Sequence, residues 1–333
     1  MMLFGALLSV LLTSLDSVRA QYPVSVQAQY PDPGACSGEC FTHDPAVIKR
    51  ADGKYFRFST LDLIGISTAD NLAGPWTRSG SVIQGASVID IAGKDVLWAP
   101  DVVYIRGNYY CFYSVSVSSS HNSAIGYAIS TTLESGSWSD QGAVVTSNSN
   151  SPYNAIDSNI VNGTGDNEWY IQWGSYWNNI YQSRASLDGK YVFRSGNEHQ
   201  IAYEPSGNHK MEGAFIWKRD TTWYLFLSKG ICCTYDPATD PIDQVYHITV
   251  CKSSNPAGPY VDKNGVACTN GGGTTVLASH GNIYAPGGQG VFHDDAHGDV
   301  LYYHYLDKSV GVNYNQSKFG WNVLKWVDGW PTV

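Results

Sequence analysis

Apolar and aromatic residues occur along this chain in short runs, and many runs come in pairs joined by a polar turn. Residues 213–217 and 223–228 are the clearest pair, with the polar residues 218–222 between them. Runs of β-branched and aromatic residues bounded by turn residues predict a β-hairpin. One carboxylate, Glu212, stands at the start of the first strand. Such positions usually hold small or apolar residues, so Glu212 is either a solvated strand end or a functional group.

The same hairpin pattern occurs five times between residues 44 and 305. The first strands of the first four copies begin at carboxylates, which are spaced by 57, 56 and 55 residues: Asp44, Asp101, Asp157 and Glu212. The fifth copy begins near Pro286. Signals for a third strand and an outer strand follow most copies, so each unit is predicted to have about four strands.

A sheet of this size cannot bury both of its faces alone, so the copies must stack on one another. Five units stacked radially form a five-bladed β-propeller. The predicted fold class is therefore all-β, with residues 21–333 as a single propeller domain. Residues 320–330 are expected to be outer strands of the fifth blade, with the segment before His43 packing nearby. A long β-sandwich is the alternative, but it would not repeat a polar residue at the start of each unit.

Composition and charge restrict the partner more than the fold. Charged residues make up only 15% of the chain, whereas it contains 34 Gly, 23 Tyr and 11 Trp, as expected for an all-β protein with many tight turns. The net charge of −9 disfavours nucleic acid and anionic membrane as partners, because both are polyanions. A neutral substrate fits better. We also expect the protein to be a monomer.

Residues 1–20 have the pattern of a secretory signal peptide. An apolar run from Leu3 to Leu15 is followed by Ser17-Val18-Arg19-Ala20, with small residues at the places a signal peptidase reads. The alternative is a buried N-terminal strand or helix. No later stretch is long and apolar enough to span a bilayer, so we expect a secreted, extracellular protein. The sequons that begin at Asn162 and Asn315 predict glycosylation.

The seven cysteines are expected to pair in an oxidising compartment, and their odd number leaves at least one free. Cys111, inside a run of aromatic residues, is the expected free thiol, buried like a small apolar residue. A zinc site is disfavoured, because no second pair of cysteines has the required spacing. The expected disulfides are Cys36 with Cys40, and Cys232 or Cys233 with Cys251 or Cys268.

Equivalent positions on successive blades of a propeller form a ring, so the four carboxylates are expected to surround one opening. Like charges held together in a partly dry funnel cannot all ionise freely, and their pKa values separate. Glycoside hydrolysis requires this separation, because one carboxylic acid protonates the leaving oxygen while a carboxylate activates water. Aromatic rings near the anchors, such as Trp98 and Trp177, are suited to pack on the face of a sugar.

Five ordered motifs resemble those of glycoside hydrolase family 43. They are His43-Asp44-Pro45, Trp98-Ala99-Pro100-Asp101, Ala155-Ile156-Asp157, Gly174-Ser175-Tyr176-Trp177 and Glu212-Gly213-Ala214. Within that family, Ser114-Val115-Ser116 and the segment 122–126 are similar to secreted fungal endo-1,5-α-L-arabinanases. The resemblance covers all five repeats, from about Tyr30 to the C-terminus.

The resemblance implies that Asp44 is the general base, that Glu212 is the general acid, and that Asp157 orients the acid and tunes its pKa. Enzymes of this type invert the anomeric centre. For each of the three, the alternative is a structural carboxylate that caps backbone amides. Asp101 is interpreted first as a residue that orients its neighbours. The substrate-binding candidates are His43, Trp98, Asp101, Tyr176 and Trp177.

The fifth repeat departs from the family pattern. Many bacterial arabinanases have a histidine directly after Pro-Gly there, which helps to hold a cation in the central channel, whereas Pro286-Gly287 is followed here by Gly288-Gln289. No cofactor is required, and a structural Ca²⁺ or Na⁺ would have to be oriented by Gln289 and His304. His304 is equally interpreted as a core residue of an inner strand.

The resemblance therefore implies a secreted hydrolase that cleaves internal α-1,5 bonds of arabinan with inversion. Exo-acting arabinanase, α-L-arabinofuranosidase and β-xylosidase activities on the same fold are the alternatives within the family. A carbohydrate-binding propeller without catalysis is the alternative from a different class. A protein-interaction propeller fits less well, because it needs no ring of acids.

Overall fold

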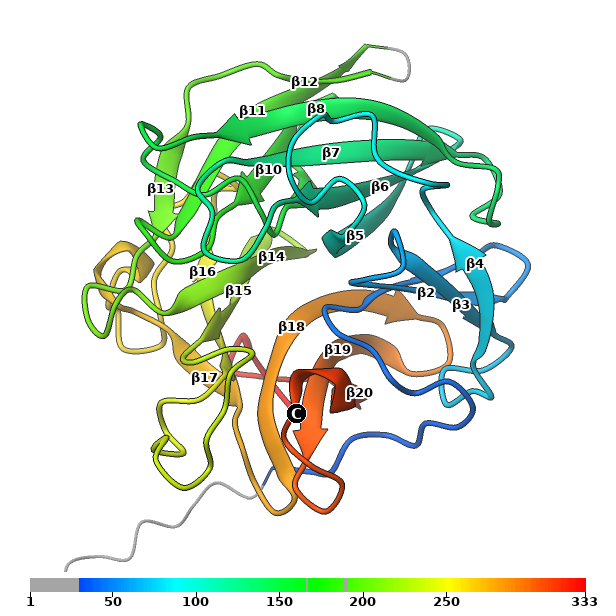
Figure 1. The fold of residues 1–333 in the computed structure, drawn as a ribbon. Coiled ribbons are helices and arrows are strands. Elements are labelled where there is room, and N and C mark those ends of the chain that lie inside the picture. Colours follow the sequence, from blue (N-terminus) through cyan, green and yellow to red (C-terminus); the bar gives the residue numbers. More distant parts are fainter. Residues whose placement is uncertain (1–29, 166, 189–190) are drawn as a thin grey trace, which may run out of the picture.

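The computed structural model describes residues 30–165, 167–188 and 191–333, which form five β-sheets arranged in a ring and one further two-stranded sheet (Figure 1). The predicted all-β, five-bladed propeller is confirmed. The expected signal peptide, residues 1–20, lies outside the described residues. The helices of the described residues are the short 3-10 turns Cys268–Asn270 and Tyr314–Gln316, and no described helix is long and apolar enough to cross a membrane.

Each blade is an antiparallel sheet whose strands follow one another outwards from the central channel, except that β12 and β13 of blade 3 both pair with β11. Blade 1 contains β1 (Ala46–Lys49), β2 (Tyr55–Ser59), β3 (Gly65–Ala69) and β4 (Thr77–Ser81). Blade 2 contains β5 (Leu97–Ile105), β6 (Asn108–Val115), β7 (Ser123–Ser130) and β8 (Ser139–Ser147). Blade 3 contains β9 (Asn159–Asn162), β10 (Trp169–Trp173), β11 (Ile180–Asp188), β12 (Tyr191–Arg194) and β13 (His199–Ala202).

Blades 4 and 5 complete the ring. Blade 4 contains β14 (Met211–Arg219), β15 (Thr222–Lys229), β16 (His247–Ser253) and β17 (Thr274–Leu277). Blade 5 contains β18 (Ile283–Asp294), β19 (Gly298–Asp307) and β20 (Lys318–Val323), and a separate hairpin follows with β21 (Lys325–Val327) and β22 (Trp330–Thr332). The inner strand β1 contacts both β5 and β18, and β14 contacts both β9 and β18.

The second strand of each blade is apolar on both faces because it lies between two neighbouring blades. In β6, Cys111 and Tyr113 belong to the apolar cluster shared with blade 1, whereas Tyr110 and Phe112 belong to the cluster shared with blade 3. Side chains alternate between the faces of a strand, so a strand buried on both sides is apolar at most of its positions. This requirement explains the aromatic runs on which the repeat was recognised.

The N-terminal segment closes the ring by lining the outer edge of blade 5. The backbone N–H of Gly34 donates to the carbonyl of Trp321 at 2.7 Å, and that of Phe319 donates to Cys40 at 2.8 Å. The segment before His43 therefore packs on β20, as predicted. Since β20 would otherwise be an exposed edge strand, this pairing protects it.

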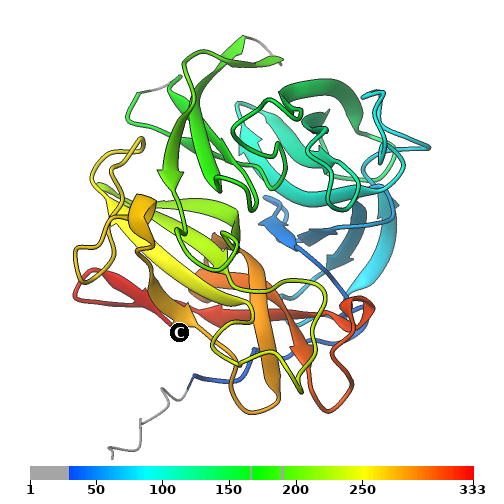
Figure 2. The same ribbon diagram turned by 60° about the vertical axis from the view of Figure 1, so that its left-hand side comes forward.

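The expectation that residues 320–330 all belong to blade 5 is only partly confirmed. Strand β20 is the third strand of blade 5, but β21 and β22 form a separate sheet that lies against blade 4 (Figure 2). Trp326 packs on the Tyr224 ring at 4.7 Å between centroids, and the Tyr224 hydroxyl donates to the carbonyl of Gly329. Aromatic packing on β15 therefore draws the hairpin away from its own blade.

The disulfides correct one of the predicted pairings. Cys36–Cys40 is present, and Cys111 is a buried free thiol, as predicted. The expected link between the two later pairs is wrong, because Cys232 bonds to Cys233 next to it and Cys251 bonds to Cys268. Cys251 lies on β16 and Cys268 in the loop that leads to β17, and both are fully buried within blade 4.

Candidate active site

The inner strands have an irregular backbone where the predicted carboxylates stand. Asp44 and Asp157 have φ angles of 43° and 57°, in the left-handed region that aspartate tolerates better than most residues. Ala99 and Gly213 adopt the same conformation in blades 2 and 4, with φ angles of 45° and 60°. β-bulges interrupt the pairing of β5 and β14 just beyond these points. Bulges redirect side chains out of the regular strand alternation, and here they turn polar groups into the channel mouth.

A cleft of about 790 Å³ opens at this mouth, and Asp44, Asp157 and Glu212 line it together. Four of the five predicted substrate-binding residues line the same cleft: His43, Trp98, Tyr176 and Trp177. Trp177 is 37% exposed and stacks on His121 with 4.7 Å between the ring centroids. The cleft thus combines three acids with exposed aromatic surface of the kind that packs on sugars.

Asp44 is held as a carboxylate. Its Oδ2 atom is 2.9 Å from Nδ1 of His43 and accepts a hydrogen bond of 2.9 Å from the Thr60 hydroxyl. Burial opposes ionisation of Asp44, but the charge of His43 and the hydrogen bond with its ring favour the ionised form, and the pKa of Asp44 lies well below the ordinary value. A carboxylate that stays ionised is suited to accept a proton from water.

Glu212 has the opposite electrostatic environment. Burial is the main reason that its pKa is raised, and the negative charge of Asp44 adds to this effect. The hydroxyls of Ser175 and Tyr246 donate to its two carboxylate oxygens and partly offset the rise. Two acids in one cleft with pKa values pushed in opposite directions are the arrangement that acid and base catalysis requires.

Asp157 lies beside Glu212 and shares its electrostatics. Burial raises the pKa of Asp157 well above its ordinary value, and the charges of Glu212 and Asp44 raise it further. The N–H of Gly213, the residue after Glu212, donates to Asp157 Oδ2 at 3.3 Å. Because the two carboxyls titrate as a coupled pair, the last proton of the pair is held to a higher pH than either group would hold it alone.

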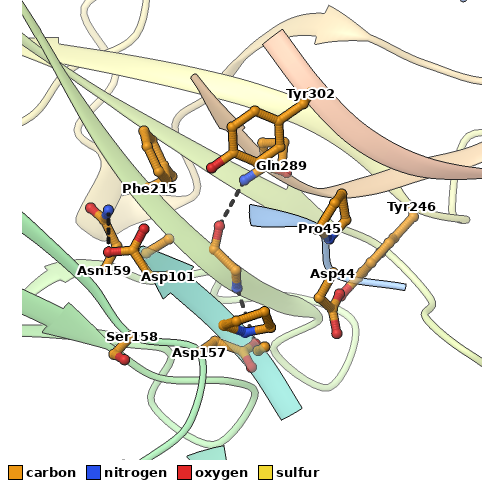
Figure 3. A pocket seen from close by; sticks show the side chains of 15 residues that line it. Asp44, Pro45, Asp101, Asp157, Ser158, Asn159, Phe215, Tyr246, Gln289 and Tyr302 are labelled. Carbon is orange, nitrogen blue, oxygen red and sulfur yellow. Dashed lines mark hydrogen bonds between the residues drawn. The ribbon is translucent and has the colours of Figure 1, made fainter. Parts of the chain in front are cut away.

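Asp101 does not join the other three acids at the cleft, which corrects the expected ring of four. It lines a small inner cavity of about 50 Å³, which Asp44 and Asp157 also line but Glu212 does not (Figure 3). Its Oδ2 atom accepts hydrogen bonds of 3.1 Å from the Asn159 amide and from the backbone of Ile160. Burial raises the pKa of Asp101 to about 7. The residue joins β5 to β9, as its structural interpretation expects, and the bulge between Trp98 and Asp101 leaves Trp98 in the cleft and Asp101 in the inner cavity.

Three comparisons place the chain among known proteins. Residues 38–331, which include all five blades, match the model of Glycosyl hydrolases family 43. The chain belongs to this family. It is 50% identical over 312 residues to a probable arabinan endo-1,5-α-L-arabinosidase A of Emericella nidulans, a match that covers 93% of this chain and 96% of the relative.

Solved structures of family 43 share the fold over nearly the whole ring. An endo-arabinanase from Bacillus licheniformis has a TM-score of 0.78 at 30% identity, covering 90% of this chain and 99% of its own. A Cellvibrio cellulosa α-L-arabinanase complexed with arabinohexaose has a TM-score of 0.77 at 28% identity, covering 88% and 95%. The family resemblance that the motifs indicated is therefore confirmed.

Within this family 43 site, Gln289 and His304 do not fit a cation that both would hold. The Gln289 side chain accepts a hydrogen bond of 2.7 Å from the Ser228 hydroxyl and donates one of 2.7 Å to the carbonyl of Gly213. His304 does not line the inner cavity. Its Nε2 atom has no partner among the described residues, but one imidazole nitrogen does not make a site for Ca²⁺, which takes six to eight oxygen ligands.

The departure at position 288 has a steric reason. Gly288 has a φ of 57°, and a Cβ atom there would lie 2.5 Å from Asp44 Oδ1 and 2.6 Å from His304 Nδ1. A histidine after Pro-Gly would therefore collide with the imidazole that supports Asp44. His304 occupies that space from the neighbouring strand β19.

Several residues of the site were not recognised from the sequence. Ser175 stands inside a quoted motif, next to Tyr176, and a hydroxyl there was a usable signal. Tyr246 gave no signal, because it follows a long loop and only the fold brings its hydroxyl to Glu212. Thr60 likewise reaches Asp44 from the end of β2.

Proposed function

We propose that this protein is an endo-1,5-α-L-arabinanase that cleaves internal bonds of arabinan with inversion. The observation that carries the proposal is the pairing of Glu212, whose pKa is raised, with Asp44, whose pKa is lowered, in one open cleft. The printed names of the fungal relatives and the arabinohexaose complex of a structural neighbour support arabinan as the substrate.

In the proposed reaction Glu212 donates its proton to the oxygen that leaves with the departing sugar chain. A water molecule attacks the anomeric carbon from the opposite side, and Asp44 takes a proton from that water. The C–O bond to the leaving chain breaks as the bond to water forms, so the product has the inverted configuration. The hydroxyls of Ser175 and Tyr246 are placed to stabilise the Glu212 carboxylate that results.

Asp157 acts in this scheme as a positioning residue. Its carboxylate accepts a hydrogen bond from the Gly213 N–H and so fixes the backbone next to the acid. Repulsion between the two carboxyls keeps their last proton bound to a higher pH, and in the proposed reaction Glu212 passes that proton to the leaving oxygen. The His43 ring lies 2.9 Å from the Asp44 carboxylate and holds it in place.

Product analysis on linear arabinan tests the activity. Endo cleavage releases a mixture of oligosaccharides early in the reaction, whereas an exo-acting enzyme releases one short product. The Glu212→Gln variant is the control for contaminating hydrolases and should release far less product. Retention of substrate without any products would instead identify a carbohydrate-binding propeller. The anomer first formed, followed by NMR, tests inversion.

We also propose that the protein is secreted as a monomer. Three disulfides among the described residues support an oxidising compartment. Expression in a secretory host should place the protein in the medium with Gln21 as its first residue, and light scattering should give the mass of one chain. Retention inside the cell with residues 1–20 intact would contradict secretion.

A further inference from the structure

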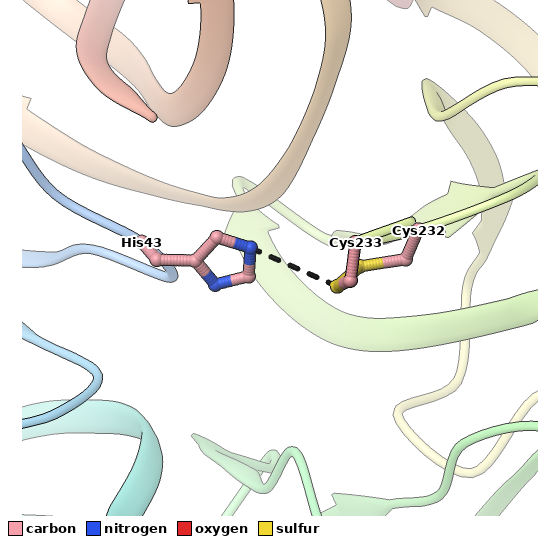
Figure 4. Close-up of side chains that lie close together, drawn as sticks. All are labelled: His43, Cys232 and Cys233. Carbon is pink, nitrogen blue, oxygen red and sulfur yellow. Dashed lines mark hydrogen bonds between the residues drawn. A yellow bond between two sulfur atoms is a disulfide. The ribbon is translucent and has the colours of Figure 1, made fainter. Parts of the chain in front are cut away.

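The active-site cleft contains a disulfide between two neighbouring residues. Cys232 and Cys233 are bonded to each other, and both line the cleft together with the three carboxylates. The Sγ atom of Cys233 lies 3.8 Å from Nε2 of His43, the residue beside the predicted base, and the imidazole points at the sulfur (Figure 4). The proposed reaction gives these sulfur atoms no role.

The disulfide is held at a fixed position in the cleft wall. It begins the loop between β15 and β16, whose base is pinned by hydrogen bonds from Ile231 N–H to the Gln244 carbonyl at 2.7 Å and from Tyr246 N–H to the Ile231 carbonyl at 3.0 Å. Tyr176 lines the same cleft as Cys232 and Cys233. The pair therefore contacts His43 of blade 1 from the loop of blade 4.

The chemistry of a disulfide suits it to contact the C–H surface of a sugar. Its sulfur atoms carry no proton to donate and are only weak acceptors, and they are large and polarisable. Because the two side chains are bonded to each other, neither can rotate away, so no side-chain freedom is lost when a ligand packs against them. Two separate thiols would lack this rigidity.

We propose that the Cys232–Cys233 disulfide is a substrate-binding surface that packs against an arabinofuranosyl unit beside the bond being cleaved, and that it contributes to selection of this sugar. The inference rests on the proposed arabinanase function. It assigns the disulfide a role in binding, distinct from the proton transfers of Asp44 and Glu212.

The oxidation state of Cys232 and Cys233 also determines whether they could bind a metal ion. The two Sγ atoms and the His43 imidazole lie within 4.8 Å of one another, and in the reduced protein they would offer two thiolates and an imidazole. The oxidised pair has no thiolate to offer. Experiments on the reduced protein therefore need a chelator, so that loss of the disulfide is not confused with metal inhibition.

The test compares two double variants by steady-state kinetics on linear arabino-oligosaccharides. Cys232→Ala with Cys233→Ala should raise KM roughly 10-fold, the size expected for a lost apolar contact with a ligand, and should leave kcat and the pH profile nearly unchanged. Cys36→Ala with Cys40→Ala removes the disulfide outside the cleft and should leave KM unchanged. An unchanged KM in the first variant would overturn the proposal. A fall in kcat together with a shift of the acidic limb of the pH profile would also overturn the proposal, because it would show that the disulfide acts through His43 and Asp44.

A second measurement keeps the test decisive if the cleft variant does not fold. The Cys36→Ala, Cys40→Ala background can be reduced with a phosphine in the presence of EDTA, and mass spectrometry can confirm which thiols are released. With Glu212→Gln added, calorimetry should show weaker oligosaccharide binding in the reduced state than in the oxidised state. Equal binding would contradict the role. A wild-type protein that is inactive on arabinan in both redox states would instead refute the proposed function.

Discussion

The Nδ1 atom of His304 accepts a hydrogen bond of 3.1 Å from the backbone N–H of Asp44, although 260 residues separate the two. His304 lies on β19 of blade 5 and Asp44 precedes β1 of blade 1, so this contact crosses the seam where the ring closes. Burial is the main reason that the pKa of His304 is lowered to about 4, and a neutral imidazole can accept this hydrogen bond. Closure of the propeller therefore helps to hold the predicted base in its left-handed conformation.

Replacing His304 should impair catalysis more than binding. His304→Ala leaves the Asp44 amide without its acceptor and removes the ring that stacks on His43 at 3.9 Å. We expect kcat to fall on the order of 10-fold, in the range of losses from misplaced catalytic groups, with KM nearly unchanged. His293→Ala, at an exposed position on β18, is the control and should not change kcat. A normal kcat in His304→Ala would refute the positioning role.

Removal of either working carboxylate should nearly abolish turnover. Asp44→Asn and Glu212→Gln keep the size of the side chain but cannot exchange the proton, so each should lower kcat by roughly 10²-fold or more. Circular dichroism should show the fold intact in both. Turnover close to the wild-type rate in either variant, measured by reducing-sugar release, would refute the assignment.

Loss of the coupled carboxyl should move the basic limb of the pH profile. The basic limb reports loss of the last proton shared by Asp157 and Glu212, and their mutual repulsion raises that pKa. In Asp157→Asn, Glu212 faces a neutral amide, so the basic limb of kcat should move to lower pH. An unchanged profile would show that Asp157 does not tune the acid.

The Tyr246 hydroxyl should have the opposite effect on the same limb. It donates a hydrogen bond to Glu212 and thereby lowers the pKa of that carboxyl. Tyr246→Phe removes the donor, so the pKa of Glu212 should rise further and the basic limb should move to higher pH. The rate should also fall, by about 10-fold, because the Glu212 carboxylate formed in the reaction loses a hydrogen bond. A shift to lower pH would contradict this account.

A buried acid at the seam should contribute to stability in a pH-dependent way. Asp294 on β18 is fully buried and accepts hydrogen bonds of 2.8 Å from Lys49 on β1 and Tyr55 on β2. Asp294→Asn should lower the free energy of unfolding at pH 7 by about 2–4 kcal/mol, as for a disrupted buried ion pair. Asp52→Asn, which affects an exposed ion pair within blade 1, is the control and should have little effect.

The sign of the pH dependence follows from the pKa of Asp294. Burial alone would raise it, but hydrogen bonds from Lys49, His297 and Tyr55 lower it from 3.8 to about 2. The stabilisation is therefore fully present above pH 4 and is lost as the pH falls through about 2. Urea unfolding of both proteins should show their difference disappearing over this interval. A difference that persists unchanged at low pH would mean that the charge is not responsible.

Much of the site could be predicted from residues near one another in sequence. Asp44, Asp157 and Glu212 each start an inner strand of one repeat, and the aromatic runs after them revealed the period. The pattern was sufficient because a strand buried between two blades is apolar at most positions, so an acid at the start of a repeat stands out from the apolar run. The even spacing of the four acids wrongly predicted that Asp101 is equivalent to the other three. A β-bulge in β5 gives Ala99, and not Asp101, the left-handed conformation that Asp44 and Asp157 have in their blades.

The sequence by itself determined the five-fold repeat, the all-β class and the three acids, because each depends on local hairpin patterns and their period. Only the tertiary structure decided which hydroxyls hold Glu212, which histidine supports Asp44 and which cysteines pair. The Tyr246–Glu212 and His304–Asp44 contacts join residues 34 and 260 positions apart, and they depend on how blades meet around the channel. Side-chain distances across blades follow from strand twist, bulges and ring closure, and no local pattern of apolar and polar residues specifies them.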